Sequence, residues 1–144
     1  MQNHLNTYKQ INVNTTNRGK IVVMLFSGAI TFLNKAKVYA NQKDYYNKGK
    51  FITKAQKIID ELNISLDMKK GKDISQNLRS LYIFLGKYLN KANIKNNPQM
   101  IDECIKILNV LKESFDEIVT NPKYKEAQSI KKRELLQNSI RRYV

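Results

Sequence analysis

Four stretches, each on the order of 20 residues long, repeat apolar side chains at the spacing of an α-helix, and this pattern constrains the fold more than any other feature of the chain. They span residues 21–40, 44–66, 73–93 and 98–119. The 144 residues include five Gly and two Pro, too few for an all-β chain with turns every ~8–12 positions. Since short loops between long helices favour antiparallel neighbours, we predict an all-α, antiparallel up-down-up-down four-helix bundle.

The helix boundaries carry recognisable signals. Asn17 can cap the first helix, while Asn97 suits an N-cap and Pro98 the first position of the fourth helix. Gly28 and Gly86 fall inside predicted helices, which is typical of close helix–helix approach.

We divide the chain into a mobile N-terminal segment (1–16), the bundle (17–119) and a basic C-terminal extension that is partly helical or disordered (120–144).

The first helix carries more apolar residues than one core face needs. At about 100° per residue, one arc predicted to face the core holds Val22, Leu25, Phe26, Ala29, Phe32, Leu33, Ala36 and Ala40. Four apolar residues lie outside that arc, namely Val23, Met24, Ile30 and Val38. This surplus indicates that the helix is buried on more than one side by its own chain, or that something else covers it.

The other three helices show narrower apolar stripes. In the second helix the stripe is Tyr45, Ile52, Ala55, Ile58 or Ile59, Leu62 and Leu66. In the third it is Ile74, Leu78, Leu81, Tyr82, Leu85, Leu89 and Ala92. In the fourth it is Ile101, Ile105, Leu108, Leu111, Phe115 and Ile118. Each stripe predicts one face turned toward a shared core.

The net charge of +14 is unevenly distributed. Ten basic residues face one acid in residues 1–59 (+9), and seven face two in 120–144 (+5), whereas 100–119 holds five acids and two lysines (−3). Such a charge is typical of proteins that bind nucleic acid or anionic membranes. However, only five of the 26 basic residues are Arg, the residue suited to phosphate and base contacts, so we expect no nucleic-acid binding.

Residues that would carry catalysis or bind a metal are scarce. The chain has one histidine, His4, and one cysteine, Cys104, which lies on the apolar side of the fourth helix. Adjacent carboxylates such as Asp60 and Glu61 point in different directions on a helix. We expect no catalytic, cofactor or metal site, and no small-molecule substrate. No apolar run of membrane-spanning length (~18–20 residues) and no signal peptide are expected, so we predict a cytoplasmic protein.

The first predicted helix contains a distinctive motif: residues 24–36 read M-L-F-S-G-A-I-T-F-L-N-K-A. This motif resembles the approximate M-L-Y-D-G-A-I-x-F-L-x-x-A of the FliS family of flagellin export chaperones. Phe26 and Ser27 stand where the family usually has Tyr and Asp. Further matching blocks are Tyr8, Val13 and Thr15, then 52–56, Ile58, Ile59, Leu62, 66–67, 77–78, 81–82, Leu89 and 92–93. The resemblance covers residues 5–119 and does not include the C-terminal extension.

The resemblance implies a cytoplasmic chaperone that binds the C-terminal, helix-forming segment of flagellin, prevents premature polymerisation and assists delivery to the flagellar export apparatus. We predict that the client surface comprises Ile21, Met24, Ile30, Phe51 and Ile59. The resemblance also implies an N-terminal segment that covers part of this surface. We predict that the covering side chains are Leu5, Tyr8, Ile11 and Val13.

Three alternatives stay open. The off-arc residues of the first helix could instead contact a fifth helix formed by the C-terminal extension. The chain could be a basic helical adaptor for nucleic acid or an anionic surface. Exposed apolar surface could also pair two copies, so we expect a monomer or a weak homodimer.

Overall fold

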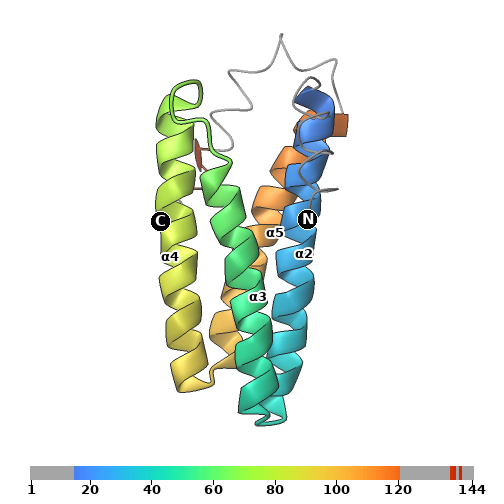
Figure 1. The fold of residues 1–144 in the computed structure, drawn as a ribbon, viewed down its shortest axis with the longest axis vertical. Coiled ribbons are helices and arrows are strands. Elements are labelled where there is room, and N and C mark those ends of the chain that lie inside the picture. Colours follow the sequence, from blue (N-terminus) through green and yellow to red (C-terminus); the bar gives the residue numbers. More distant parts are fainter. Residues whose placement is uncertain (1–14, 121–136, 139, 141–144) are drawn as a thin grey trace, which may run out of the picture.

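The computed structural model describes residues 15–120 and residues 137, 138 and 140, without the side chains of 15–17. The four long helices are α2 (Thr15–Asn41), α3 (Tyr45–Ile64), α4 (Lys72–Lys95) and α5 (Pro98–Thr120). They run alternately up and down (Figure 1). α2 packs against α3 and α5, and α4 packs against the same two helices. The predicted antiparallel four-helix bundle is confirmed.

The two ends of the bundle differ. At one end, which we call the base, short connections join α2 to α3 and α4 to α5 (Figure 1). The opposite end holds the start of α2, the end of α5 and the longer connection, 65–71, between α3 and α4. The chain therefore enters and leaves the four-helix bundle at the end opposite the base.

Local capping explains where the helices begin. The Asn97 Oδ1 atom accepts from the backbone N–H groups of Gln99 (3.0 Å) and Met100 (3.2 Å), which confirms it as the N-cap of α5. Asp44 caps α3 in the same way, since its Oδ1 accepts from Asn47 N at 3.2 Å. The prediction for Asn17 is wrong because α2 already begins at Thr15, so that Asn17 lies inside the first helical turn.

The predicted stripes form the core. The buried apolar residues include Phe26 and Leu33 of α2, Ile52 and Ile59 of α3, Leu81, Leu85 and Leu89 of α4, and Ile101, Leu108 and Leu111 of α5. Not every stripe residue is fully buried. Tyr45, at the first position of α3, remains 58% exposed. The half-buried members of the stripes, which pack against the core, are Val22, Leu25, Phe32, Leu66, Ile74 and Phe115. Ile140, in the C-terminal extension, joins the same core cluster.

Close approach explains one of the two helical glycines singled out above. A Cβ at Gly28 would lie 3.2 Å from Cδ1 of Ile58, so α2 and α3 are tightly packed there. At Gly86 a Cβ would meet nothing within 4 Å, and the expectation of close approach at Gly86 is wrong.

Long-range hydrogen bonds tie the base together. Lys48 is almost fully buried, and its Nζ donates to the carbonyl of Asn93 at 2.8 Å, at the C-terminal end of α4. A cation suits that position because unpaired carbonyls give a helix C-terminus partial negative charge; burial nevertheless lowers the pKa of Lys48. Asn96, which caps α4 in the left-handed conformation, donates from Nδ2 to the carbonyl of Ala40 at 3.1 Å. Residues 37–48 and 93–96 thus form a connected end.

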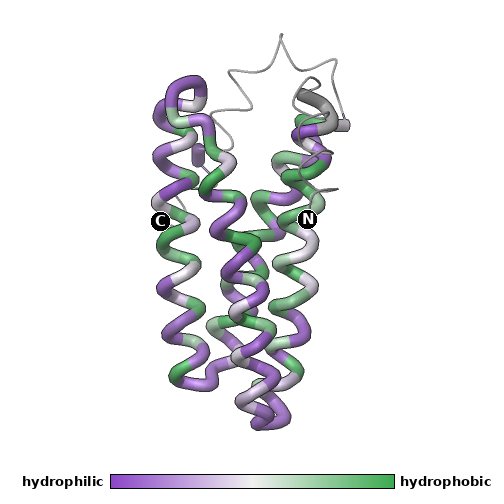
Figure 2. Tube along the Cα trace, viewed as in Figure 1, coloured by the Kyte–Doolittle hydropathy of each residue, from purple (hydrophilic) through white to green (hydrophobic). Residues whose placement is uncertain are grey.

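The central turns of α2 are green to white in Figure 2, which shows their apolar character. By length and composition alone, residues 18–41, with a mean hydropathy of 1.5, are apolar enough to cross a membrane. The expectation that no apolar run approaches that length is therefore wrong. The finding is weak evidence for a span, because a core helix of a bundle passes the same test, and Phe26 and Leu33 of α2 lie in this core.

Candidate functional site

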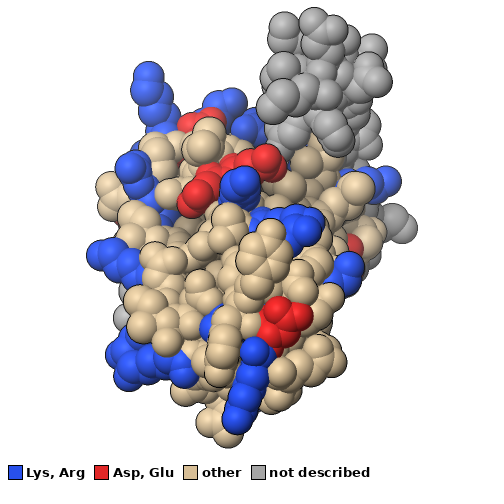
Figure 3. Space-filling view, turned by 60° about the horizontal axis from the view of Figure 1, so that its bottom comes forward, with Lys and Arg blue, Asp and Glu red and all other residues tan. Residues whose placement is uncertain are grey.

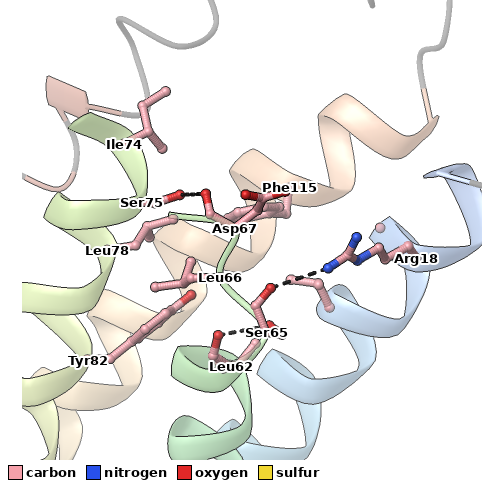
Figure 4. Close-up of a pocket in the computed structure, with 12 residues that line it drawn as sticks. Arg18, Leu62, Ser65, Leu66, Asp67, Ile74, Ser75, Leu78, Tyr82 and Phe115 are labelled. Atoms are coloured by element: carbon pink, nitrogen blue, oxygen red, sulfur yellow. Dashed lines mark hydrogen bonds between the residues drawn. The ribbon is translucent and has the colours of Figure 1, made fainter. Parts of the chain in front are cut away.

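An apolar pocket opens at the end of the bundle opposite the base (Figure 4). Its volume is about 320 Å³, and all four long helices contribute to its wall. The apolar lining residues are Val22, Leu62, Leu66, Ile74, Leu78, Tyr82 and Phe115. Since the helices end here, their core stripes have fewer neighbours to pack against, and part of the apolar surface stays open.

Polar contacts fix the connection between α3 and α4 at the pocket edge. The hydroxyl of Ser75 donates to the carbonyl of Asp67 at 2.8 Å, and Arg18 Nη2 donates to the carbonyl of Ser65 at 3.4 Å (Figure 4). The Asp67 carboxylate accepts from the backbone N–H groups of Lys70 and Lys69 at 3.0 and 3.1 Å. These bonds, that from Lys70 first, lower the pKa of Asp67. The pocket thus has a charged rim around an apolar interior.

Tyr82 gives the interior one polar group. Its ring packs against Phe26, with centroids 6.5 Å apart, and its hydroxyl points toward the pocket (Figure 4). Burial raises the pKa of Tyr82 far above its ordinary value of 10.0, so the phenol stays neutral at physiological pH. It can donate one hydrogen bond to a bound segment.

The structure does not bring the five predicted client-binding residues into one surface. Met24 is 70% exposed, whereas Ile59 is 1% exposed and belongs to the core. Ile30 lies seven residues before Lys37, on the same side of α2, and Lys37 pairs with Asp102 of α5. Phe51 is a half-buried residue of α3.

Ile21 is half-buried near the start of α2, one turn before Met24 and close in sequence to the pocket-lining residues Arg18, Gly19 and Val22. The four predicted cover residues, Leu5, Tyr8, Ile11 and Val13, lie outside the described residues. Of the predicted surface, Ile21 and Met24 are nearest in sequence to the pocket-lining residues. Met24 lies two residues after Val22 and therefore points to a different side of α2.

Sequence reasoning missed the pocket itself. Leu66, Ile74 and Phe115 were assigned to core stripes, but the structure leaves them half-buried and lining the pocket. Each is the first or last member of its stripe, or next to the last. That position is the signal that could have identified them.

Metal binding and nucleophilic chemistry set requirements that clusters of metal ligands and the one cysteine would have to meet. Among them, no group of three or more His, Cys, Asp or Glu could hold a metal ion. Cys104 is buried, and burial raises the pKa of its thiol to about 12, which leaves almost no reactive thiolate at neutral pH. The fold and the pocket together define an all-helical bundle with an open apolar pocket at one end.

Comparison with known proteins identifies the family. The family model for flagellar protein FliS matches residues 1–122. The flagellar secretion chaperone FliS of Vibrio cholerae is 38% identical over 122 residues, which are 82% of this chain and 90% of that protein. The one from Salmonella typhimurium is 34% identical over 110 residues (76% and 82%), and that from Campylobacter jejuni 32% over 123 residues (84% and 96%).

The chain belongs to the FliS family. Its role is that of a chaperone in flagellar export, and the family is not one of enzymes. The match to the family model ends at residue 122, so residues 123–144 lie beyond the matched region even though Ile140 is part of the core.

Proposed function

We propose that the chain binds the C-terminal, helix-forming segment of flagellin in the cytoplasm, keeps it from polymerising and presents it for export. The observation that carries this proposal is the apolar pocket, open at the same end of α2 as the exposed Met24. A chaperone for an amphipathic segment needs apolar surface beyond its own core, and helix-in-groove recognition supplies such a match.

In this proposal, an apolar side chain of the client fills the pocket, and the client chain continues around α2 to cover Ile21 and Met24, which lie on other sides of that helix than Val22. Burying one large apolar side chain contributes about 1.5–3 kcal/mol, and the Tyr82 hydroxyl can donate to a client carbonyl. The pocket volume of about 320 Å³ lies at the lower end of the ~300–1,000 Å³ range of ligand pockets. It suits a side chain or two rather than a whole helix.

The N-terminal segment supplies the proposed cover. Arg18 and Gly19 line the pocket, so the chain that precedes α2 starts beside it. Leu5, Tyr8, Ile11 and Val13 would bury their side chains there until flagellin displaces them. The free chaperone would then expose less apolar surface, which limits self-association.

Titration calorimetry with the C-terminal segment of flagellin, at low and high salt, tests the proposal. We expect one-to-one binding that largely survives high salt and has a negative heat-capacity change, the mark of apolar burial. No binding at either salt would refute the proposal. An affinity that collapses with salt would instead support a basic adaptor for nucleic acid or an anionic surface.

Two matched substitutions locate the site. Ile74→Asp places a carboxylate in the pocket wall at the start of α4 and should weaken flagellin binding. Ile94→Asp makes the same change at the other end of α4, where Ile94 is 85% exposed and far from the pocket, and should leave binding unchanged. Equal effects of the two variants would contradict the pocket as the client site.

A further inference from the structure

A second unusual surface lies on α2 and α3 in the half of the bundle nearer the base. It consists of three half-buried aromatic rings and two lysines, Phe32, Lys35, Tyr39, Phe51 and Lys54, and we call it the lysine–aromatic surface. The Phe51 ring lies 5.9 Å from Phe32 and 5.6 Å from Tyr39, centroid to centroid, and stacks on Tyr39 at 12°. None of these residues lines the apolar pocket at the end of the bundle opposite the base.

Two ammonium groups approach the same ring. Lys35 Nζ lies 5.4 Å and Lys54 Nζ 5.0 Å from the centroid of Phe51, and Lys54 Nζ is also 5.5 Å from that of Phe32. Contacts of this length attract a cation to the face of a ring, but they do not neutralise its charge. Neither lysine forms an ion pair with a carboxylate of the described residues.

The opposite side of α2 provides the contrast. There Lys37 Nζ lies 3.1 Å from Oδ1 of Asp102, and Lys106 Nζ lies 3.6 Å from its other oxygen. The acidic helix α5 thus neutralises the lysine that faces it. No acidic helix borders the lysine–aromatic surface, because α2 and α3 are both basic in this region.

The positive charge continues along α3. A shallow hollow of about 460 Å³ adjoins the surface through Lys54 and is lined by Tyr46, Gly49, Lys50, Thr53 and Lys57. No carboxylate lines it. Lys50, Lys54 and Lys57 stand at helical spacings of four and three residues, so they share one side of α3. Figure 3, which brings the base forward, likewise shows basic side chains over much of this end and acidic ones at fewer places.

We propose that the lysine–aromatic surface is a second docking site, for an acidic amphipathic helix of a partner protein. Apolar side chains of that helix would pack on the half-buried rings, while carboxylates one turn apart would pair with Lys35 on one flank and with the α3 lysines on the other. Charge complementarity selects this partner, since the surface combines apolar area with cations that lack an acid.

The same residues disfavour the other anionic partners. Nucleic-acid sites stack bases on open aromatic faces, but the faces of Phe51 are occupied by Tyr39 and the two lysines. No Arg lies among the residues that form the surface or line the hollow. A membrane surface needs apolar side chains that project into the lipid, whereas these rings lie half-buried against the bundle.

Binding of synthetic peptides to the full chain tests the proposal. The probe is an amphipathic helical peptide with Leu on one face, Glu on both flanks and one Trp. The chain has no Trp, so excitation at the red edge of the Trp absorption band, where Tyr does not absorb, follows the peptide alone. A second peptide carries Gln at every Glu position. At low salt we expect the Glu peptide to bind about tenfold more tightly than the Gln peptide. This ratio corresponds to two Glu–Lys pairs that are partly exposed to solvent.

The double variant Lys35→Gln/Lys54→Gln should lose this preference, with only a small fall in melting temperature from the lost contacts to the rings. Its control, Lys87→Gln/Lys91→Gln, removes the same charge from exposed positions of α4 and should keep the preference. Two outcomes would overturn the proposal. Equal binding of both peptides would show that the lysines do not select an acidic helix. Equal loss in both double variants would show only the general effect of the +14 charge.

Two further measurements separate the possibilities. The first measures binding of phosphatidylglycerol vesicles and of single-stranded DNA. If either binds the chain more tightly than the Glu peptide does, and loses that binding in Lys35→Gln/Lys54→Gln, the proposed acidic-helix site is overturned. The same variant should bind the flagellin segment normally; loss of that binding would show a single shared site and contradict a second one. Failure of the wild-type chain to bind flagellin, with the peptide preference intact, would refute the proposed function alone.

Discussion

The substitution Met24→Asp tests whether the surplus of apolar residues on α2 serves a client. Met24 is 70% exposed, and complete burial of a Met side chain contributes about 1.5–3 kcal/mol. Burial of the exposed seven-tenths under a client helix would therefore contribute about 1–2 kcal/mol. A carboxylate in its place would lose that contribution and resist desolvation, so the Kd for the flagellin segment should rise by about 5–30-fold or more.

Calorimetric titration measures the change in Kd, and circular dichroism during heating measures the fold. The melt should stay cooperative at the wild-type temperature because Met24 has little contact with the core. Val38→Asp is the control, since Val38 is a 52% exposed residue of the same helix, about 20 Å further along its axis. A Met24→Asp chain that unfolds, or that binds flagellin as tightly as wild type, would refute the reasoning, as would an equal effect of Val38→Asp.

Three further predictions concern stability, each measured as the free energy of unfolding in urea. Asn97→Ala removes the N-cap of α5 and should cost about 1 kcal/mol; no loss would contradict the capping role. Ile140→Ala should cost about 2–5 kcal/mol because the side chain is buried in the core, whereas the exposed Asn138→Ala should cost nothing. The Lys37 hydrogen bond lowers the pKa of Asp102 below 3.8, so its stabilisation is present above that pH and is lost as pH falls through the lowered pKa. Asp102→Asn should therefore cost at most about 0.5 kcal/mol at pH 7, because the pair is about one-third exposed, and the difference from wild type should vanish in acid.

Periodicity predicted the core because a helix repeats its burial every three to four residues regardless of what it packs against. Periodicity could not decide which of Ile58 and Ile59 faces the core, because the two residues are adjacent in the sequence and either one fits the apolar stripe. The structure buries Ile59 and packs Ile58 against Gly28, a choice set by how closely α2 approaches α3. That distance is a tertiary property, and no pattern within α3 encodes it.

The candidate site was harder to predict than the fold for the same reason. A stripe shows that Leu66 or Phe115 is apolar, but not that its helix ends before a neighbour can cover it. Likewise, the surplus of apolar residues on α2 indicated extra contact surface, but not which of these residues face the bundle and which face solvent. In the structure Met24 is exposed to solvent, Ile30 shares a side of α2 with Lys37, which pairs with Asp102 of α5, and Phe51 has two lysines as neighbours.

The tied base has a mechanical consequence for the opposite end. Lys48 and Asn96 join α3 to α4 and α4 to α2 at the base. At the pocket end, the bonds from Arg18 and Ser75 both go to the connection between α3 and α4, so neither joins α4 directly to another helix. α4, with 24 residues, is about 36 Å long. A tilt of about 5° around its fastened end moves its other end by about 3 Å, nearly the width of a methyl group. The pocket, at the end opposite the base, can therefore widen by nearly the width of a methyl group while the hydrogen bonds at the base stay intact.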